Sequence, residues 1–223
     1  MKPSQALDSS GGRDTRARGN GSSIGTGESP VNGTAGNQGT VDRMHKKSTL
    51  PLVLKALAFA AEKHRDQRRK NVEASPYINH PIALANVLAN EGDVDDEAVI
   101  CAALLHDTIE DTETTSEELN AAFGDEITGI VLEVTDDKSL PKAERKLLQI
   151  QHASRLSDGA KLVKLADKIC NLRDMAHQPP AGWDLPRRQA YFDWAKAVIG
   201  GLRGTNLSLE AAFDKAYAMK PTR

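Results

Sequence analysis

The chain has 223 residues, of which 39% are hydrophobic, and it carries a formal net charge of −2 with an isoelectric point near 6.3. This length and composition are typical of one globular domain with some additional sequence. The almost balanced charge gives no general reason to expect a nucleic acid or a membrane surface as a partner.

The sequence predicts a cytoplasmic protein. No apolar run approaches the roughly 20 residues that a membrane-spanning helix needs, and the N-terminus lacks the apolar core of a signal peptide. The two cysteines, Cys101 and Cys170, lie in apolar helical patterns and form no Cys-x-x-Cys motif. We therefore interpret them as reduced core residues and not as a disulfide that holds the fold together.

Residues 1–48 differ in composition from the rest of the chain. They are rich in Gly, Ser, Thr and Asn, contain no aromatic residue, and hold nine of the 17 glycines. Such a segment buries too little apolar surface to offset the entropy that ordering it would cost. We predict a disordered tail here and place the folded domain at residues 49–223.

From residue 50 onward, apolar residues recur at the spacing of a helix. The pattern predicts helices over approximately residues 51–67, 80–88, 95–106, 115–124, 127–136, 160–174, 186–202 and 207–218, with a further polar helix that begins at residue 141. Thr115 and Glu118 form a capping box for one of these helices, and Gly124 closes it. Because no run of β-branched residues alternates with period two, we predict an all-α domain of about eight or more helices.

Basic residues gather between the first two predicted helices. Four basic side chains lie within residues 65–70, and Ser75-Pro76 then ends the helical pattern. By its charge alone, this stretch is typical of a solvated helix end, where cations suit the helix dipole.

The most informative stretch is residues 102–112, where an apolar run ends in His106, Asp107, Glu110 and Asp111. Carboxylates at the end of a buried helix are costly unless a positive charge neutralises them, and a divalent cation would suit His106 and Asp107 together. If the helix continues, His106 with Glu110 and Asp107 with Asp111 lie four residues apart on one side. The alternative is a turn whose acids cap backbone N–H groups.

Two further residues qualify as ligands only with support from elsewhere. His80, which we place at the cap of the second helix, is more typical of a structural histidine when taken alone. Asp167 lies on the helix predicted over residues 160–174, where a carboxylate needs a partner. A surface salt bridge to Lys164 or Lys168 is the alternative to a metal.

Together, His80, His106, Asp107 and Asp167 provide two imidazoles and two carboxylates from three separate predicted helices. Their order and spacing resemble those of the HD-domain metal-dependent phosphohydrolases. The segments that make the resemblance closer are Arg69-Lys70, PYINHP at 76–81, residues 102–112, VTDDK at 134–138 and KLVKLADKICNLRD at 161–174. They look like the hydrolase domain of the stringent-response (p)ppGpp enzymes, above all the small stand-alone hydrolases of the metazoan-type Mesh class and their bacterial counterparts. The resemblance covers the chain from about residue 50 to its end.

This resemblance implies an HD-type helical bundle that binds a single Mn²⁺. The implied metal ligands are His80, His106, Asp107 and Asp167. Glu110 and Asp111 are placed beside the nucleophilic water, as base or orienting group and as proton source, with the two roles left unassigned. The implied reaction releases pyrophosphate from the ribose 3′ position of ppGpp or pppGpp, and ppGpp leaves GDP. Because the chain stops at Arg223 without a synthetase domain, we expect it to degrade the alarmone and not to make it.

The resemblance also assigns residues to the nucleotide. The implied substrate-binding residues are Arg69, Lys70, Asn171, Tyr191, Lys138 and Lys142. The first two stack on the guanine or hydrogen-bond it, and the next two hold the ribose or the 5′ phosphates. The last two, with Arg145, are candidates for the distal phosphates, and a surface-charge interpretation fits them equally. By the resemblance His64 is not in the ligand set, and we expect it either to contact the residues of the site from behind or to be structural.

Two other functions stay open at this point. One is hydrolysis of a different nucleotide ribose phosphate, such as the 2′-phosphate of NADPH. The other is a regulator that binds ppGpp without turnover, and the intact set of ligand and acidic residues argues against it.

Overall fold

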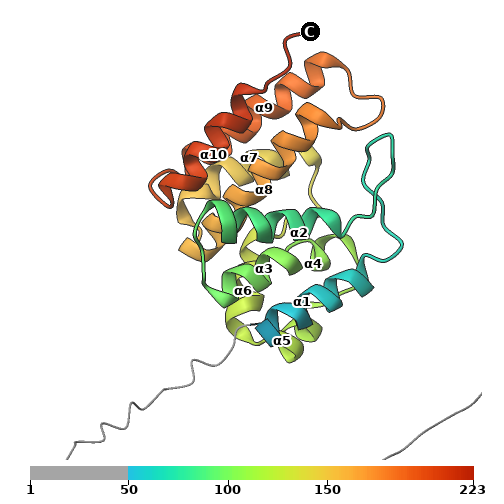
Figure 1. The fold of residues 1–223 in the computed structure, drawn as a ribbon, viewed down its shortest axis with the longest axis vertical. Coiled ribbons are helices and arrows are strands. Elements are labelled where there is room, and N and C mark those ends of the chain that lie inside the picture. The colour runs from blue at the N-terminus through green and yellow to red at the C-terminus, as the bar shows by residue number, and fades with distance from the viewer. Residues whose placement is uncertain (1–49) are drawn as a thin grey trace, which may run out of the picture. The chain divides into compact units, whose positions relative to one another are not determined.

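The computed structural model describes residues 50–223, in which helices run from α1 to α10 (Figure 1). The only β-type pairing among these residues is an isolated bridge between Arg68 and Pro76. The prediction of an all-α domain is therefore confirmed, while the tail predicted over residues 1–48 lies outside the described residues. None of the helices from residue 50 onward is both long and apolar enough to span a bilayer.

Two of the helical segments are not α-helical, since η1 is a π-helix and η2 is a 3₁₀-helix. In chain order the elements are α1 (Leu50–Lys63), α2 (Asn79–Asn86), η1 (Val87–Glu91), α3 (Glu97–Leu105), α4 (Thr108–Asp111), α5 (Ser116–Phe123), α6 (Asp125–Val134), α7 (Lys142–His152), η2 (Ala153–Arg155), α8 (Asp158–His177), α9 (Leu185–Gly200) and α10 (Leu207–Ala218).

Several helices begin and end at the residues that the sequence predicts. The hydroxyl of Thr115 accepts a hydrogen bond from the backbone N–H of Glu118 at the start of α5. Asp96 caps α3 in the same way and accepts from two backbone N–H groups of its first turn. Gly124 separates α5 from α6 with a φ of 84°, a left-handed conformation that glycine adopts without a steric penalty. These caps fix where the buried helix α3 starts and how the chain turns after α5.

The first helix is shorter than predicted, because α1 ends at Lys63 and not near Gln67. The backbone N–H of Gln67 donates to the carbonyl of His64, three residues back, so the α-helical ladder stops. The Arg68 guanidinium then donates hydrogen bonds to the carbonyl oxygens of residues 65 and 67. A second small correction concerns His80, which lies in the first turn of α2 and not at its cap.

The chain also breaks its helix at His106 and Asp107, between α3 and α4. The hydroxyl of Thr108 donates to the carbonyl oxygen of Leu105, at 2.7 Å, and so competes with the backbone bond that would continue the helix. Asp107 has φ −100° and ψ 0°, away from ideal helical values. Residues 106 and 107 therefore form a turn, and the condition that one helix continues through residues 106–111 is not met.

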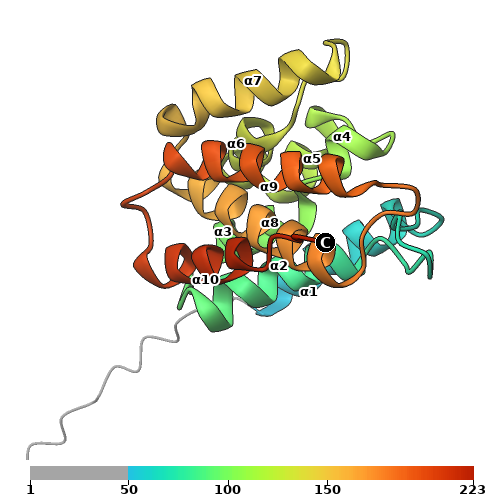
Figure 2. The same cartoon turned by 90° about the horizontal axis from the view of Figure 1, so that it is seen from above.

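Helix α3 is the centre of the core, and seven of its eight residues from Ala98 to Leu105 are buried, all except Ile100. It contacts α1, α2, α6 and α8, and each fully buried leucine or valine contributes roughly 1.5–3 kcal/mol. Helix α8 contacts α2, α3, α6, α9 and α10, so it lies between the two halves of the bundle (Figure 2). The C-terminal end of α3 thus meets the start of α2 and the middle of α8, and polar residues of all three face one another there.

Candidate metal centre

Three parts of the fold bring the four predicted ligands together. His80 comes from α2, His106 and Asp107 from the turn after α3, and Asp167 from α8. Ligand atoms of His80, His106 and Asp167 all lie within 4.8 Å of one another. The Oδ2 atom of Asp107 lies 2.9 Å from Nε2 of His106. Both imidazoles are buried, so the cluster is screened from bulk water.

The hydrogen bonds of His106 show that this donor set fits a cation. Its Nδ1 lies 2.8 Å from the carbonyl oxygen of Ala103, and because a carbonyl only accepts, Nδ1 must donate. Its Nε2 is buried and has no hydrogen-bond partner, although Oδ2 of Asp107 lies close to it. In most metal-binding histidines one ring nitrogen donates to a carbonyl or carboxylate in this way, and the other ring nitrogen faces the metal. The centre therefore suits a divalent metal ion.

The charges of the cluster are strongly coupled. Burial opposes a charge on His106, but the carboxylates of Asp107 and Asp167 outweigh it and raise the pKa of His106 to about 9. Burial likewise opposes ionisation of Asp107, and the attraction of His106 outweighs it and holds the pKa of Asp107 below its usual range. Burial lowers the pKa of His80. In the protein without a metal, a proton on His106 balances the negative charge of the Asp107 and Asp167 carboxylates. A bound metal ion would balance that charge instead.

Each carboxylate oxygen of Asp167 accepts a hydrogen bond from a side chain outside the candidate ligand set. Its Oδ2 accepts from Nζ of Lys168 at 2.8 Å, and its Oδ1 accepts from the Asn171 amide at 2.5 Å and lies 3.3 Å from Nε2 of His80. The alternative salt bridge to Lys168 therefore exists, but it is buried and not on the surface. Nζ of Lys164 instead donates to the carbonyl of Val134. The ion pair and a metal can share Asp167, because they use different oxygens.

Sequence reasoning gave no role to Tyr77, which donates a hydrogen bond from its hydroxyl to Oδ2 of Asp107. Burial and the Asp107 carboxylate raise the pKa of Tyr77 far above its usual range, so the phenol stays a donor. The Tyr77 ring also lies beside the guanidinium of Arg69, whose Cζ is 5.6 Å from the ring centroid. Its place in the PYINHP segment, three residues before His80, is the signal that could have identified it.

Glu110 and Asp111 both lie on the short helix α4 but have different surroundings. Burial, followed by the nearby Asp107 carboxylate, raises the pKa of Glu110. One Glu110 oxygen accepts from the backbone N–H of Asp136 at 3.2 Å, and the other lies 3.8 Å from Arg145. Asp111, in contrast, forms an ion pair with Lys138 through Oδ1 and accepts from the Gln67 amide at Oδ2, at 3.3 Å.

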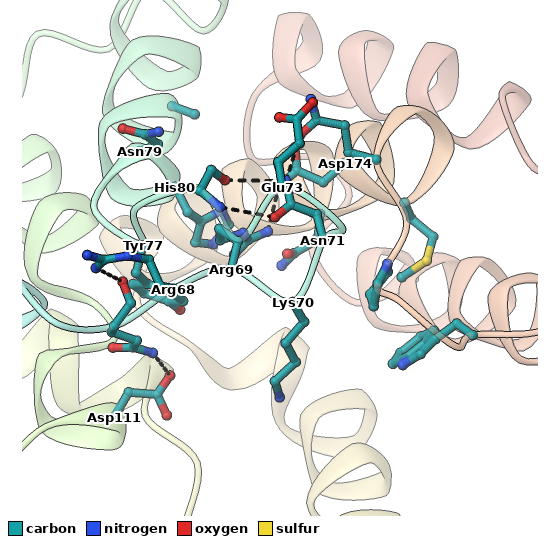
Figure 3. Close-up of a pocket in the computed structure, with 18 of the residues that line it drawn as sticks. Arg68, Arg69, Lys70, Asn71, Glu73, Tyr77, Asn79, His80, Asp111 and Asp174 are labelled. Carbon is teal, nitrogen blue, oxygen red and sulfur yellow. Dashed lines mark hydrogen bonds and ion pairs between the residues drawn. The ribbon is translucent and has the colours of Figure 1, made fainter.

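Two adjoining pockets surround this centre. The outer pocket, drawn in Figure 3, has a volume of about 580 Å³ and lies between the loop after α1 and the end of α8. The inner pocket, of about 210 Å³, contains the four candidate ligands and Glu110. The residues that line both pockets are Arg69, Tyr77, His80, Asp111 and Asn171. The outer pocket is large enough for a nucleotide-sized ligand and leads to the metal centre.

The structure places the six candidate substrate residues in three different settings. Arg69, Lys70, Asn171 and Tyr191 line the outer pocket. The Arg69 guanidinium is held there by an ion pair of 2.6 Å with Asp174. Lys142 lines a smaller neighbouring pocket of about 130 Å³ together with Trp183 and Tyr191. Lys138 forms an ion pair with Asp111, a catalytic candidate.

Comparison with known proteins shows extensive similarity. The family model described as "HD domain" matches residues 56–190. The chain is 56% identical over 170 residues to the Xenopus tropicalis protein named guanosine-3′,5′-bis(diphosphate) 3′-pyrophosphohydrolase MESH1, covering 76% of this chain and 95% of that protein. It is 53% identical over 168 residues to the Homo sapiens protein of that name, covering 75% and 94%. A solved structure described as "A metazoan ortholog of SpoT hydrolyzes ppGpp and plays a role in starvation responses" matches with a TM-score of 0.74 and 48% identity, covering 77% of this chain and 97% of that one.

Proposed function

This chain belongs to the HD-domain family, where it groups with the MESH1 proteins, and from this premise we propose that it is a metal-dependent 3′-pyrophosphohydrolase of ppGpp. Water attacks the phosphorus bonded to the ribose 3′ oxygen, and the bond between them breaks. The products are pyrophosphate and GDP. The role in the cell is turnover of the stringent-response alarmone. The observation that carries the proposal is the cluster of His80, His106 and Asp167, within 4.8 Å of one another at the base of a nucleotide-sized pocket.

We propose Mn²⁺ as the metal, held by His80, His106, Asp107 and Asp167. Two neutral imidazoles and two carboxylates suit Mn, Fe or Zn by ligand chemistry, and the charge of a divalent ion balances the two carboxylates. The resemblance to the family favours Mn²⁺ among these. When bound, such an ion lowers the pKa of a coordinated water and screens the negative charge of a phosphate.

Glu110 is the better candidate for the group that accepts the proton of the attacking water. Burial and the Asp107 carboxylate raise its pKa, and a raised pKa makes a carboxylate a stronger base. Asp111 carries a donor on each oxygen, from Lys138 and from Gln67. These two partners hold the carboxylate in place, so Asp111 suits the role of orienting the reacting groups.

The outer pocket supplies the contacts for the rest of the nucleotide. Arg69 and Lys70 take the guanine, with the Arg69 guanidinium held by Asp174 in a position to stack. Asn171 and Tyr191 hold the ribose or the 5′ phosphates. For the distal phosphates we propose Lys142, which lines the smaller neighbouring pocket and whose Nζ lies 5.7 Å from the centroid of the Trp183 ring.

The test is to incubate the purified protein with ppGpp and Mn²⁺ in ¹⁸O-labelled water, with a chelator as control. We expect GDP and pyrophosphate, with the label in the pyrophosphate because water attacks phosphorus. An intact nucleotide that binds without turnover would overturn the proposal in favour of a ppGpp-binding regulator. Orthophosphate released from NADPH, with ppGpp untouched, would identify a hydrolase of another ribose phosphate.

A further inference from the structure

Asp111 is the end of a chain of side chains that begins at His64, just after α1. His64 is only 1% exposed. Its Nδ1 lies 2.6 Å from Oε1 of Gln67, and the Gln67 amide nitrogen lies 3.3 Å from Oδ2 of Asp111, in the contact drawn beside Asp111 in Figure 3. Lys138 pairs with the other oxygen of Asp111. Gln67 thus links a buried histidine to a catalytic candidate, Asp111, that follows Gln67 by 44 positions in the sequence.

The donors and acceptors in this series of hydrogen bonds follow from the chemistry of the groups at its two ends. An ionised carboxylate only accepts hydrogen bonds, so the Gln67 amide must turn its N–H toward Asp111. Its carbonyl oxygen then faces His64, and that oxygen also only accepts. Nδ1 of His64 must therefore carry the proton. Nε2 is buried and has no hydrogen-bond partner, so it takes no part in these contacts.

The His64 ring has a second contact that any test must keep separate. It packs on Tyr77, with ring centroids 4.8 Å apart and an angle of 37° between the planes. Tyr77 in turn donates to Asp107, one of the candidate metal ligands. Loss of the His64 ring would disturb both paths, whereas loss of its Nδ1–H alone would disturb only the path to Asp111.

We propose that His64 is a positioning residue for Asp111, and that it acts by fixing the orientation of the Gln67 amide. Without the Nδ1–H donor, the amide is free to rotate and to present its oxygen to the carboxylate, which repels it. Asp111 then loses one of the two donors that fix its position. This inference rests on the proposed function, because Asp111 is taken as a catalytic carboxylate.

Three substitutions of His64 separate the donor from the ring. His64→Asn places an amide N–H near the position of Nδ1, His64→Gln places one near Nε2, and His64→Phe keeps a ring against Tyr77 without any donor. We expect kcat for ppGpp to fall about tenfold in the Gln and Phe variants, as for one misplaced hydrogen bond. The KM for ppGpp and the affinity for Mn²⁺ should stay within about twofold of wild type. The Asn variant should recover most of the loss in kcat.

A double variant tests whether the effect passes through Gln67. If it does, His64→Phe added to Gln67→Leu costs nothing beyond Gln67→Leu alone. The proposal is overturned if the two losses multiply, if folded His64→Asn is as slow as His64→Phe, or if His64→Phe keeps the wild-type kcat. Thermal unfolding of each variant identifies those that fail to fold, and the double variant compares proteins that both lack the Gln67 amide.

A measurement on the resting protein separates this inference from the proposed function. In ¹⁵N-histidine NMR of the full chain, the His64 signal is assigned by its loss in the His64→Asn variant. We expect it to show a protonated Nδ1, and to change in Gln67→Leu. A wild-type protein that leaves ppGpp intact would overturn the proposed function alone. A His64 signal with the proton on Nε2 would overturn the hydrogen-bond chain, whatever the activity.

Discussion

The Tyr77 hydroxyl donates to Oδ2 of Asp107, the same oxygen that lies 2.9 Å from Nε2 of His106. This hydrogen bond orients a candidate metal ligand from outside the ligand set. Groups in such positions change metal affinity by about 10–100-fold when they are removed, because they fix the ligand's orientation and basicity.

We therefore expect Tyr77→Phe to bind Mn²⁺ about tenfold more weakly than the wild type, with the fold unchanged. Isothermal titration with Mn²⁺ measures the affinity directly. Tyr217→Phe is the matched control, because Tyr217 also donates to an aspartate, Asp193, but on the exposed side of α9 and α10. Equal affinities in the Tyr77 variant and the wild type would show that Asp107 needs no support from the phenol.

Metal binding and turnover should respond differently to the carboxylates of the centre. Asp107→Ala and Asp167→Ala remove candidate ligands, so we expect both to lose Mn²⁺ binding and activity together. Glu110→Gln keeps the shape of the side chain but cannot accept a proton, and it should bind Mn²⁺ normally while kcat falls about 10²–10⁴-fold. Mn²⁺ titration and ppGpp hydrolysis on the same samples decide the matter. Equal loss of metal in all three variants would make Glu110 a ligand.

Much of the fold follows from local patterns. The apolar spacing of residues 95–105 predicts the buried helix α3, and Thr115 with Gly124 predicts where α5 begins and ends. His106 and Asp107 are also visible in the sequence as a candidate metal site, because a histidine and an aspartate after such an apolar run need a neutralising partner. These features depend on residues that are close together along the chain.

What the sequence could not give depends on side chains that meet from distant segments. The break between α3 and α4 comes from the Thr108 hydroxyl, which helix propensity alone does not predict. The partners that distinguish Asp111 from Glu110 are Gln67 and Lys138, which lie on other parts of the chain. Periodicity assigned Lys168 to the surface, whereas α9 covers it and Trp194 lies beside it, with Nζ 4.6 Å from the ring centroid.

The guanidinium of Arg69 is expected to contribute to nucleotide binding more than to the chemical step. It lies between Asp174 and the Tyr77 ring, where the two pockets adjoin, and it is not one of the candidate metal ligands or of the two catalytic carboxylates. Arg69→Ala should raise the KM for ppGpp about tenfold and change kcat by less than about threefold. Steady-state kinetics measures both. Arg65→Ala is the control, since Arg65 makes exposed ion pairs outside the pocket. A fall in kcat alone would place Arg69 in the chemical step.

A bidentate ion pair between Glu91 and Arg173, of 2.6 and 2.7 Å, connects η1 to α8. The hydrogen bonds from Arg173 lower the pKa of Glu91 below its usual value of 4.5. A carboxyl with a lowered pKa stabilises the fold above its unfolded pKa, and this contribution disappears as the pH falls through the folded value. We expect Glu91→Gln to cost about 0.5–1 kcal/mol at pH 7, since the pair is partly exposed, and less below pH 4.5.

Urea unfolding at pH 7 and below pH 4.5 measures how much Glu91→Gln lowers the free energy of unfolding. Glu113→Gln is the control, because Glu113 is exposed and forms no ion pair within residues 50–223. A loss of stability in Glu91→Gln that is the same at pH 7 and at low pH would show that packing, and not the charge, is what Glu91 contributes.

Lys168 is a buried cation of the centre, and its removal should cost more stability without a bound metal than with one. Its side chain is 4% exposed, and its ion pair with Asp167 outweighs the effect of burial and raises its pKa. Lys168→Met leaves Asp167 buried without that partner, a change that typically costs about 3–5 kcal/mol. Mn²⁺ would supply a new positive charge beside Asp167, so saturating metal should restore part of the loss. Thermal unfolding with a chelator and with Mn²⁺ measures both effects, and Lys161→Met, which removes a surface lysine of the same helix, serves as control. If Mn²⁺ stabilises Lys168→Met no more than it stabilises the wild type, the ion does not replace the lysine charge at Asp167.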